Sequence, residues 1–277
     1  MIRPLLAALL AAALVPGLGC LAYNDPCQPL VANPDAVIGI LGENVYLDRP
    51  FARHDNNALG QMAADAYQHA EDDSGDLAGR AELGIINGGS IRAEGLCINR
   101  TVLPSGPLTD GVFHEVLLFE NRLVTVNLTE QQLVDMMEHS VGSLFPEGQP
   151  IGTPFGGFLH VSESTTVRVD CGRPRGQRVL AMQVGNRAVQ LPPRANVFYR
   201  VAMADFLLQG GDGYGPIFAG AGQDPARNPV QSRKLGGVDS NIASAYMKSV
   251  YSSDARPLRE ASRIVFENCA RPSRPTR

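Results

Sequence analysis

Strand-type and helix-type segments follow one another in irregular order along most of the chain, and this pattern limits the fold classes open to it. Short apolar runs between turn residues predict strands, whereas apolar residues spaced three or four apart predict helices. The expected strands are 36–41, 83–86, 123–128, 179–184, 188–191 and 197–203, and the expected helices are 57–71, 130–141 and 242–250. No linker divides these elements, so the sequence predicts one α+β domain of mixed β-sheets packed with helices.

Local signals mark where two helices begin and where loops interrupt the pattern. Asn56 or Asn57 is a plausible N-cap for the first long helix. Thr129 followed by Gln132 forms a capping box for the second. Two stretches rich in Gly, Pro and polar residues, 145–157 and 219–237, predict loops.

The charge balance argues against nucleic acid as a partner. The chain has 24 Lys and Arg against 28 Asp and Glu, for a formal net charge of −4. Proteins that bind a nucleic-acid backbone present clustered Lys and Arg, because they must neutralise its phosphates. This chain has no basic block, so we expect no nucleic-acid partner.

The first residues have the composition of a secretion signal. Arg3 precedes an apolar run over residues 5–15, which is too short to span a bilayer. Two processing routes stay open: Cys20 is lipidated at a loose lipobox, or ordinary cleavage follows Ala22. Both predict an exported protein that is periplasmic, extracellular or an outer-membrane lipoprotein, with a lipid anchor as its only membrane contact. The expected organisation is a signal over 1–22, a linker over 23–35, a domain over 36–268 and a disordered tail over 269–277.

The remaining cysteines suggest disulfides. Cys27, Cys97, Cys171 and Cys269 make an even number, which in an oxidising compartment predicts up to two bridges with three possible connectivities. Because domain termini often lie close together, the expected pairs are Cys27–Cys269 and, by elimination, Cys97–Cys171. No two cysteines have the spacing of metal ligands.

A catalytic centre cannot be recognised in the sequence. The five histidines are scattered, without the close pairs that a dinuclear metal site requires. The Gly-x-Ser-x-Gly motif of a serine nucleophile is also missing from the sequence. We therefore expect no catalytic residue and no metal ligand in this chain.

Two glycine-rich segments look instead like sites of ligand recognition. The sequence Asn-Gly-Gly-Ser-Ile-Arg occupies 87–92, directly after an expected strand. Its glycines allow close backbone approach, and the planar guanidinium of Arg92 suits phosphate. The second segment, Gly-Gly-Asp-Gly-Tyr at 210–214, surrounds one acid with three glycines. Either segment alone is more typical of a turn.

Taken together and in order, several segments are similar to one known family. They are Arg53 with Gly60, the segments 87–92 and 119–121 (Phe-Glu-Asn), Gly-Gly-Phe-Leu at 156–159, and 205–214. This arrangement resembles the C-terminal domain of the 5′-nucleotidase / UDP-sugar hydrolase family, from about Val37 to Phe266. The resemblance implies that family's α+β domain fold and a nucleotide or nucleoside ligand.

The resemblance also implies roles for the residues that match the family's nucleoside-binding positions. Phe119 and Phe206 match two phenylalanines that enclose the base on both faces, and stacking of this kind tolerates different bases. Asn121 matches a position that bonds the base edge. Asp212 matches a carboxylate that accepts the ribose hydroxyls. Gly211 belongs to the same glycine-rich motif and is expected in the binding site.

The expected phosphate end is made of arginines and one amide. Arg53, Asn87 and Arg92 match the family's phosphate-contacting group, and Arg49 matches a further arginine found in some members. The planar fork of arginine makes charge-assisted contacts that suit phosphate better than lysine.

The resemblance further implies a division of labour. Family enzymes carry an N-terminal metallophosphatase domain that supplies two metal ions, whereas here the expected signal runs almost directly into the C-terminal domain. We therefore expect the substrate-recognition half of a 5′-nucleotidase-type phosphohydrolase in extracytoplasmic nucleotide breakdown. It would hold no cofactor itself, with Zn²⁺ or Mn²⁺ in a separately encoded metallophosphatase partner. The alternatives are a non-catalytic protein that scavenges or senses nucleotides and, less in keeping with the intact motifs, a surface protein built on a decayed domain.

Overall fold

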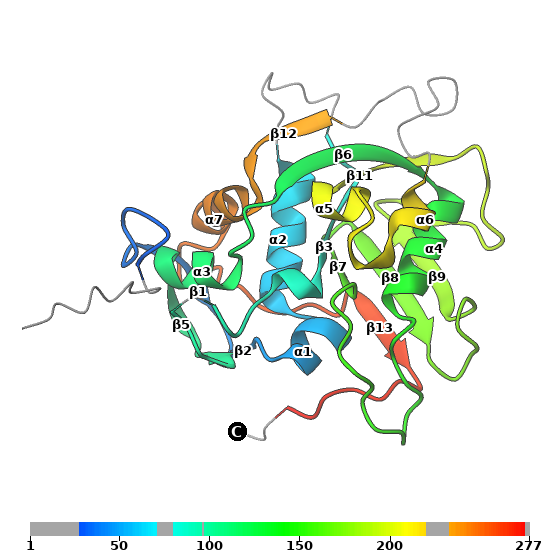
Figure 1. Cartoon of the computed structure of the whole chain (residues 1–277), viewed down its shortest axis with the longest axis horizontal. Coiled ribbons are helices and arrows are strands. Elements are labelled where there is room, and N and C mark those ends of the chain that lie inside the picture. The colour runs from blue at the N-terminus through cyan, green and yellow to red at the C-terminus, as the bar shows by residue number, and fades with distance from the viewer. Residues whose placement is uncertain (1–27, 71–79, 96, 220–232, 275–277) are drawn as a thin grey trace, which may run out of the picture.

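The computed structural model describes residues 28–70, 80–95, 97–219 and 233–274 of the 277-residue chain. Two larger β-sheets, two short strand pairs and the helices around them make one α+β domain (Figure 1), which confirms the predicted fold class. The expected signal and Cys20 and Cys27 lie outside the described residues.

The larger sheet has five strands in the order β12–β6–β11–β3–β7. The pairing of β11 with β3 is parallel and the other pairings are antiparallel. The strands are β3 (Leu83–Asn87), β6 (Arg122–Thr129), β7 (Leu159–Val161), β11 (Phe198–Ala204) and β12 (Arg233–Val238). The position of β12 corrects the prediction of a loop over 219–237, because this strand is defined by its pairing with the distant β6.

The smaller sheet has the order β10–β9–β8–β13, and β13 runs parallel to β8. Its strands are β8 (Thr165–Asp170), β9 (Val179–Val184), β10 (Arg187–Val189) and β13 (Ile264–Glu267). The strands expected at 179–184 and 188–191 correspond to β9 and β10, which pair as an antiparallel hairpin. Two short antiparallel pairs complete the described strands: β1 (Val37–Leu41) with β5 (Gly106–Thr109), and β2 (Val45–Tyr46) with β4 (Val102–Leu103).

The predicted helix starts are confirmed by their hydrogen bonds. The side chain of Asn57 accepts the backbone N–H groups of Leu59 and Gly60, and Thr129 with Gln132 forms the full capping box. The helices are α1 (Arg49–His54), α2 (Ala58–His69), α3 (Asp110–Val116), α4 (Glu130–Ser140), α5 (Asp205–Leu208), α6 (Gly215–Phe218) and α7 (Asp239–Val250). Short 3₁₀ helices occupy Gly88–Ser90 and Gly211–Gly213.

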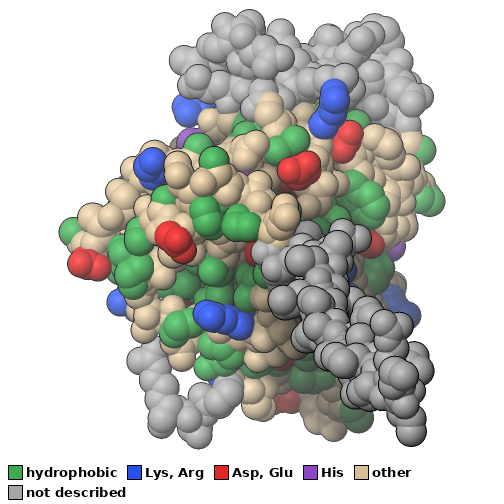
Figure 2. Space-filling model, turned by 60° about the vertical axis from the view of Figure 1, so that its left-hand side comes forward, with side chains coloured by type: hydrophobic (Ala, Val, Ile, Leu, Met, Phe, Trp, Pro, Cys, Tyr) green, Lys and Arg blue, Asp and Glu red, His purple; other side chains and the backbone are tan. Residues whose placement is uncertain are grey.

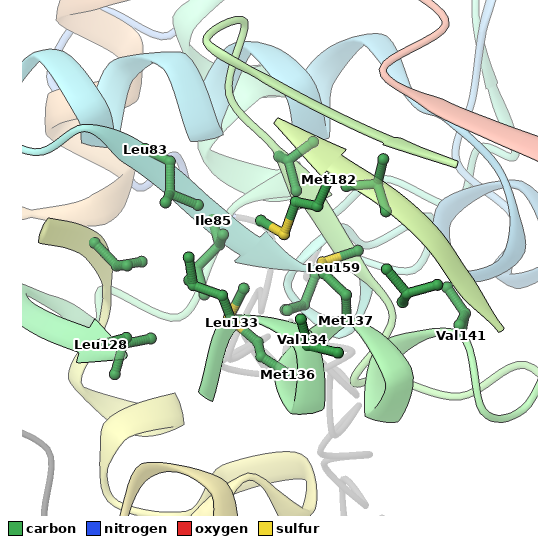
Figure 3. Packing of buried hydrophobic residues seen from close by; sticks show 14 of the residues in the cluster. Leu83, Ile85, Leu128, Leu133, Val134, Met136, Met137, Val141, Leu159 and Met182 are labelled. Carbon is green, nitrogen blue, oxygen red and sulfur yellow. The ribbon is translucent and has the colours of Figure 1, made fainter. Parts of the chain in front are cut away.

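The larger sheet separates two hydrophobic cores. Helix α2 lies against β3, β7 and β11 on one face, with α7 packed on α2 (Figure 1). Helix α4 and the smaller sheet cover the other face. Figure 3 shows Leu83 and Ile85 of β3 beside Leu133 of α4 and Met182 of β9. Ile86, the next residue along β3, faces the α2 core instead, as the two-residue period of a strand requires.

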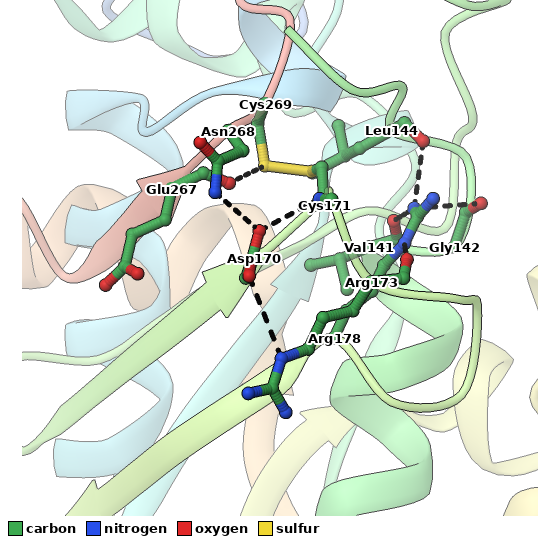
Figure 4. Close-up of a disulfide and its surroundings, with 11 residues drawn as sticks. Val141, Gly142, Leu144, Asp170, Cys171, Arg173, Arg178, Glu267, Asn268 and Cys269 are labelled. Atoms are coloured by element: carbon green, nitrogen blue, oxygen red, sulfur yellow. Dashed lines mark hydrogen bonds and ion pairs between the residues drawn. A yellow bond between two sulfur atoms is a disulfide. The ribbon is translucent and has the colours of Figure 1, made fainter.

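The disulfide differs from both predicted pairs. Cys171 is bonded to Cys269, with the two Cα atoms 4.9 Å apart (Figure 4). This bond excludes the predicted pairs Cys27–Cys269 and Cys97–Cys171, because each needed one of these two sulfur atoms. The reason is the parallel pairing of β13 with β8, which places residue 267 opposite residue 170 and brings the following cysteines together. A structural disulfide is typical of exported proteins.

The C-terminal segment is held to the domain as far as it is described. The backbone N–H of Ala270 donates to the carbonyl of Phe145 at 2.8 Å. Arg271 forms an ion pair with Asp55, and Arg274 forms one with Glu260 at 2.6 Å. Residues 269–274 of the expected tail thus make defined contacts with the domain, where their arginines meet carboxylates on its surface. Residues 275–277 lie outside the described residues.

The face shown in Figure 2 is mixed in character. On this face, basic and acidic side chains are interspersed among hydrophobic and polar ones. Among the described residues, no helix has the length and apolar character needed to cross a bilayer.

Candidate functional site

Most of the predicted ligand-binding residues meet at one cavity. It has a volume of about 320 Å³ and is lined by Arg53, Asn87, Gly89, Ser90, Arg92, Phe119, Asn121, Gly156, Phe206 and Asp212. These residues come from α1, the turn after β3, the segment between α3 and β6, a loop before β7, and the region of α5. Seven of the nine predicted binding residues line this cavity, and the other two, Arg49 and Gly211, lie next to the cavity.

The turn after β3 is built for close packing. A Cβ atom on Gly88 would lie 2.1 Å from the carbonyl oxygen of Ala52 in α1, so only glycine lets α1 approach here. The backbone N–H of Gly89 donates to the carbonyl of Gly156 at 2.7 Å. These contacts join α1, the β3 turn and the Gly156 loop around the cavity.

Asn87 lies at the centre of a short hydrogen-bond chain. Its Nδ2 donates to Oδ2 of Asp212 at 2.7 Å, and its Oδ1 accepts from the hydroxyl of Ser90 at 2.7 Å. Asn87 is buried, so these bonds fix its orientation. Asn87 therefore holds the carboxylate of Asp212, the acid that the family resemblance implies for the ribose.

Two aromatic rings line the cavity while remaining exposed. Phe119 is 46% exposed and Phe206 is 41% exposed, unlike the core phenylalanines Phe113 and Phe158, which are fully buried. The guanidinium of Arg92 lies over the Phe119 ring, 5.0 Å from its centroid. A Cβ atom on Gly211 would lie 2.4 Å from the Phe206 ring, so Gly211 makes room for this ring rather than lining the cavity itself.

The arginines form a cluster of like charge at one part of the cavity. Burial lowers the pKa of Arg53 from its ordinary value, and the neighbouring charges of Arg49 and Arg92 lower it further. The Nε of Arg53 is buried and has no hydrogen-bond partner. A bound anion would relieve this repulsion.

Arg49 lies at the outer edge of this cluster. It pairs with Glu94 at 3.4 Å, and both side chains are more than 60% exposed, so this contact is weak. Arg49, Arg53 and Arg92 together line a small pocket that adjoins the cavity. Arg49 and Arg53 both belong to α1 and lie about one helical turn apart.

Asn121 is held by a residue that the sequence did not single out. Its Nδ2 donates to Oδ2 of Asp239 at 2.8 Å, and its backbone carbonyl accepts the backbone N–H of Asp239 at 2.9 Å. Burial raises the pKa of Asp239, and the bond from Asn121 opposes that shift. The bond to Asp239 uses one of the two N–H groups on Nδ2, so Oδ1 can accept from a ligand and the second N–H can donate to one.

Three further residues at the cavity were not predicted individually from the sequence. Gly89, Ser90 and Gly156 line the cavity, and each lies inside a motif that the sequence analysis recognised. Asp239 lies in no motif, and no local signal points to it.

The described residues do not fit a dinuclear metal centre. Within 28–70, 80–95, 97–219 and 233–274, no three His, Cys, Asp or Glu side chains come together in a group that could hold a metal ion. His160 is buried against the Ala52 carbonyl at 2.9 Å, and burial lowers its pKa to about 4. No step of a reaction is therefore assigned to a metal in this part of the chain.

The fold is an α+β domain, and one of its cavities gathers aromatic, cationic and acidic side chains in one place. The family model for the 5′-nucleotidase C-terminal domain matches residues 37–220, and the chain belongs to this family. The predicted family resemblance is thus confirmed.

Individual relatives agree with this assignment. An apyrase from Tabanus yao is 27% identical over 222 residues, which are 77% of this chain and 35% of the apyrase. A 5′-nucleotidase precursor from Thermus thermophilus superposes with a TM-score of 0.66 at 25% identity, over 87% of this chain and 41% of that one. The NAD nucleotidase of Haemophilus influenzae shares the fold, with a TM-score of 0.59 at 16% identity, over 84% of this chain and 38% of that one. The chain thus spans about two fifths of the length of these relatives, or less.

Proposed function

We propose that this domain binds a nucleotide or nucleoside and acts as the substrate-recognition part of a 5′-nucleotidase-type phosphohydrolase outside the cytoplasm. The observation that carries the proposal is the convergence of Phe119, Phe206, Asp212 and the arginines on one cavity. The family assignment and the similarity to an apyrase and a 5′-nucleotidase support it.

The two exposed rings would bind the base. Stacking on an aromatic side chain contributes about 1–3 kcal/mol per base and does not depend on base identity. Oδ1 of Asn121 would accept an N–H from the base edge. This arrangement favours any flat, aromatic base with a donor on its edge.

The acid would bind the sugar. An ionised carboxylate accepts hydrogen bonds only, and each of its oxygens can accept more than one. Oδ2 of Asp212 already accepts from Asn87. Oδ1, the other oxygen of this cavity-lining carboxylate, would accept the ribose hydroxyls.

The arginine cluster would bind the phosphate. Arg53 and Arg92 line the cavity, and Arg49 extends the positive charge outward. Hydrolysis of the bound nucleotide would need a metallophosphatase partner, which we propose holds divalent metals such as Zn²⁺ or Mn²⁺. In this division of labour the described domain would present the nucleotide, and a water molecule in the partner's site would attack phosphorus, with the nucleoside leaving through its 5′ oxygen.

The proposed location is outside the cytoplasm. The Cys171–Cys269 disulfide supports an oxidising environment. The periplasm, the outer membrane through a lipid on Cys20, and the extracellular space all fit this proposal.

Replacing Phe206 with alanine should weaken adenosine binding by about 1–3 kcal/mol, or roughly 5- to 150-fold in Kd, because one stacking face is lost. Calorimetric titration of the purified domain measures the effect. Val265→Ala is the matched control, because Val265 is similarly exposed but lies in β13, outside the cavity. Unchanged affinity in Phe206→Ala would remove the stacking role.

Replacing Arg92 with alanine should weaken AMP binding by about 10- to 100-fold, because a charge-assisted hydrogen bond contributes about 1.5–3 kcal/mol. Adenosine should lose only a few-fold, through the contact with the Phe119 ring, worth about 0.5–1 kcal/mol. The control is Arg256→Ala, since Arg256 lies over the Tyr251 ring in a comparable contact outside the cavity. Equal losses for AMP and adenosine would show that Arg92 does not contact phosphate.

The proposal as a whole is tested by titrating the chain with AMP and adenosine and following phosphate release with Mn²⁺ or Zn²⁺, with and without a candidate metallophosphatase. Binding, with release only when the partner is present, supports the proposed role. Binding without release in every mixture would favour the scavenging or sensing protein instead. Absence of binding would contradict both.

A further inference from the structure

A histidine outside the recognised motifs contacts the backbone of the proposed ribose-binding acid. Nε2 of His139, in the last turn of α4, lies 2.8 Å from the carbonyl oxygen of Asp212. A carbonyl can only accept a hydrogen bond, so the imidazole must carry a proton on Nε2 and donate it. His139 does not itself line the cavity that contains Asp212.

The backbone that this bond supports has an uncommon conformation. Asp212 has φ of +52°, in the left-handed region that few residues other than glycine adopt. Such a conformation persists only where the surroundings hold it in place. A Cβ atom on Gly213, which has φ of +81°, would lie 3.1 Å from Cε1 of His139, so the turn is folded closely around the imidazole.

The imidazole is itself held by aromatic neighbours. The rings of Tyr214 and Phe155 meet it edge-on, with centroid distances of 4.6 Å and 5.3 Å. Tyr214 is fully buried and its hydroxyl donates to the carbonyl of Gly157 at 2.5 Å. The direction of the Nε2–H bond is thereby fixed before any ligand arrives.

Asp212 is consequently held at two points by residues outside its own turn. His139 binds its backbone carbonyl, and Asn87 donates to its carboxylate at 2.7 Å. Within the turn, two backbone hydrogen bonds of 3.2 Å and 3.3 Å also hold the 3₁₀ conformation. The bond from His139 ties this turn to α4 and so helps to determine where the carboxylate stands relative to the cavity.

We propose that His139 is a positioning residue for Asp212 and that it determines how strongly the site distinguishes a ribose from a sugar without hydroxyls. This inference rests on the proposed function, in which Asp212 accepts the ribose hydroxyls. It adds a residue that touches no ligand and acts through the turn at 210–214.

The test compares adenosine with 2′,3′-dideoxyadenosine by calorimetry. The wild-type chain is expected to bind adenosine about 10- to 100-fold more tightly than 2′,3′-dideoxyadenosine, because only adenosine has the hydroxyls that donate hydrogen bonds to the charged carboxylate of Asp212. His139→Phe keeps a ring but loses the donor, and it should reduce that preference at least about five-fold by weakening adenosine alone. His139→Gln places an amide donor at a comparable reach and should restore most of the preference.

The control is His69→Phe. His69 occupies the last turn of α2, its Nδ1 lies 2.8 Å from the carbonyl of Asp65, and its ring stacks on Tyr246. This environment resembles that of His139 but lies away from the cavity. The preference for adenosine should be unchanged in this variant.

The outcomes separate the inference from the proposal beneath it. A wild-type chain without preference for adenosine overturns the ribose role of Asp212 and the positioning role with it. A wild-type preference that persists in His139→Phe, or equal weakening of both ligands, overturns the positioning role alone. If His139→Phe does not fold, the ring tautomer of the wild-type histidine decides by ¹⁵N NMR: protonation on Nε2 supports the inference, and an Nδ1–H tautomer overturns it.

Discussion

Replacing Arg263 with alanine is expected to lower the free energy of unfolding by about 3–5 kcal/mol, as found when one partner of a buried ion pair is removed. The side chain of Asp65 is 0% exposed and accepts two hydrogen bonds of 2.7 Å from this guanidinium, which is itself 12% exposed. Arg263 also donates to the carbonyls of Gln61 and Val161. Alanine would leave a buried carboxylate and two backbone acceptors without this partner.

The loss should depend on pH. Burial raises the pKa of Asp65 from its ordinary value of 3.8, while Arg263 opposes that shift. Without Arg263, the pKa of Asp65 in the folded chain moves further above its value in the unfolded chain. Between these two pKa values, the folded chain binds more protons than the unfolded chain. The variant therefore regains stability relative to wild type as the pH falls toward 3.8, and the loss is largest near neutral pH.

Denaturant unfolding at several pH values measures both effects. The matched control is Arg168→Ala, because Arg168 also makes two short bonds to one carboxylate, Glu267, but the side chains are 55% and 37% exposed. Such exposed pairs contribute about 0–1 kcal/mol. Equal losses of stability in the two variants at neutral pH would show that burial of the Asp65–Arg263 pair does not cause the loss in Arg263→Ala.

Removing the disulfide with the double substitution Cys171→Ala and Cys269→Ala is expected to cost about 2–4 kcal/mol. The bond closes a long loop, with 98 residues of sequence separation, and restrains the unfolded chain accordingly. It also fastens β13, and the segment that carries Arg271 and Arg274, to β8. The comparison is guanidinium unfolding of the variant and of wild type.

The reductant supplies the control for this second prediction. Dithiothreitol should shift the unfolding midpoint of the wild-type chain toward that of the double variant and leave the variant itself unchanged. A midpoint in the variant equal to that of the oxidised wild type would contradict the prediction.

Features determined by a few neighbouring residues could be predicted from the sequence. Asn57 and the pair Thr129 and Gln132 satisfy backbone groups within three residues of themselves, so their effect does not depend on the rest of the fold. The strand β12 and the disulfide could not be predicted in this way. Both follow from strand pairings between distant segments, β12 with β6 and β13 with β8, which no local pattern specifies.

The same distinction between local and long-range features applies to the residues of the site. Phe119, Phe206 and Arg92 lie in motifs that match a known family, so their meeting at one cavity could be expected. His139 and Asp239 were missed because each acts through a partner far along the chain. His139 is 73 residues from Asp212, and Asp239 is 118 residues from Asn121. Supporting residues of this kind have no sequence signature of their own, since any donor or acceptor at the right place in space would serve.

The distribution of the cavity walls along the chain has a thermodynamic consequence. Its lining residues run from Arg53 to Asp212 and belong to segments that are separate in the unfolded chain. A nucleoside held between them would act as a reversible cross-link that only the folded chain can form. At a concentration about 100-fold above its Kd, such a ligand adds about 2.7 kcal/mol to the free energy of unfolding. Saturating ligand would thus offset a large part of what the loss of Arg263 or of the disulfide removes.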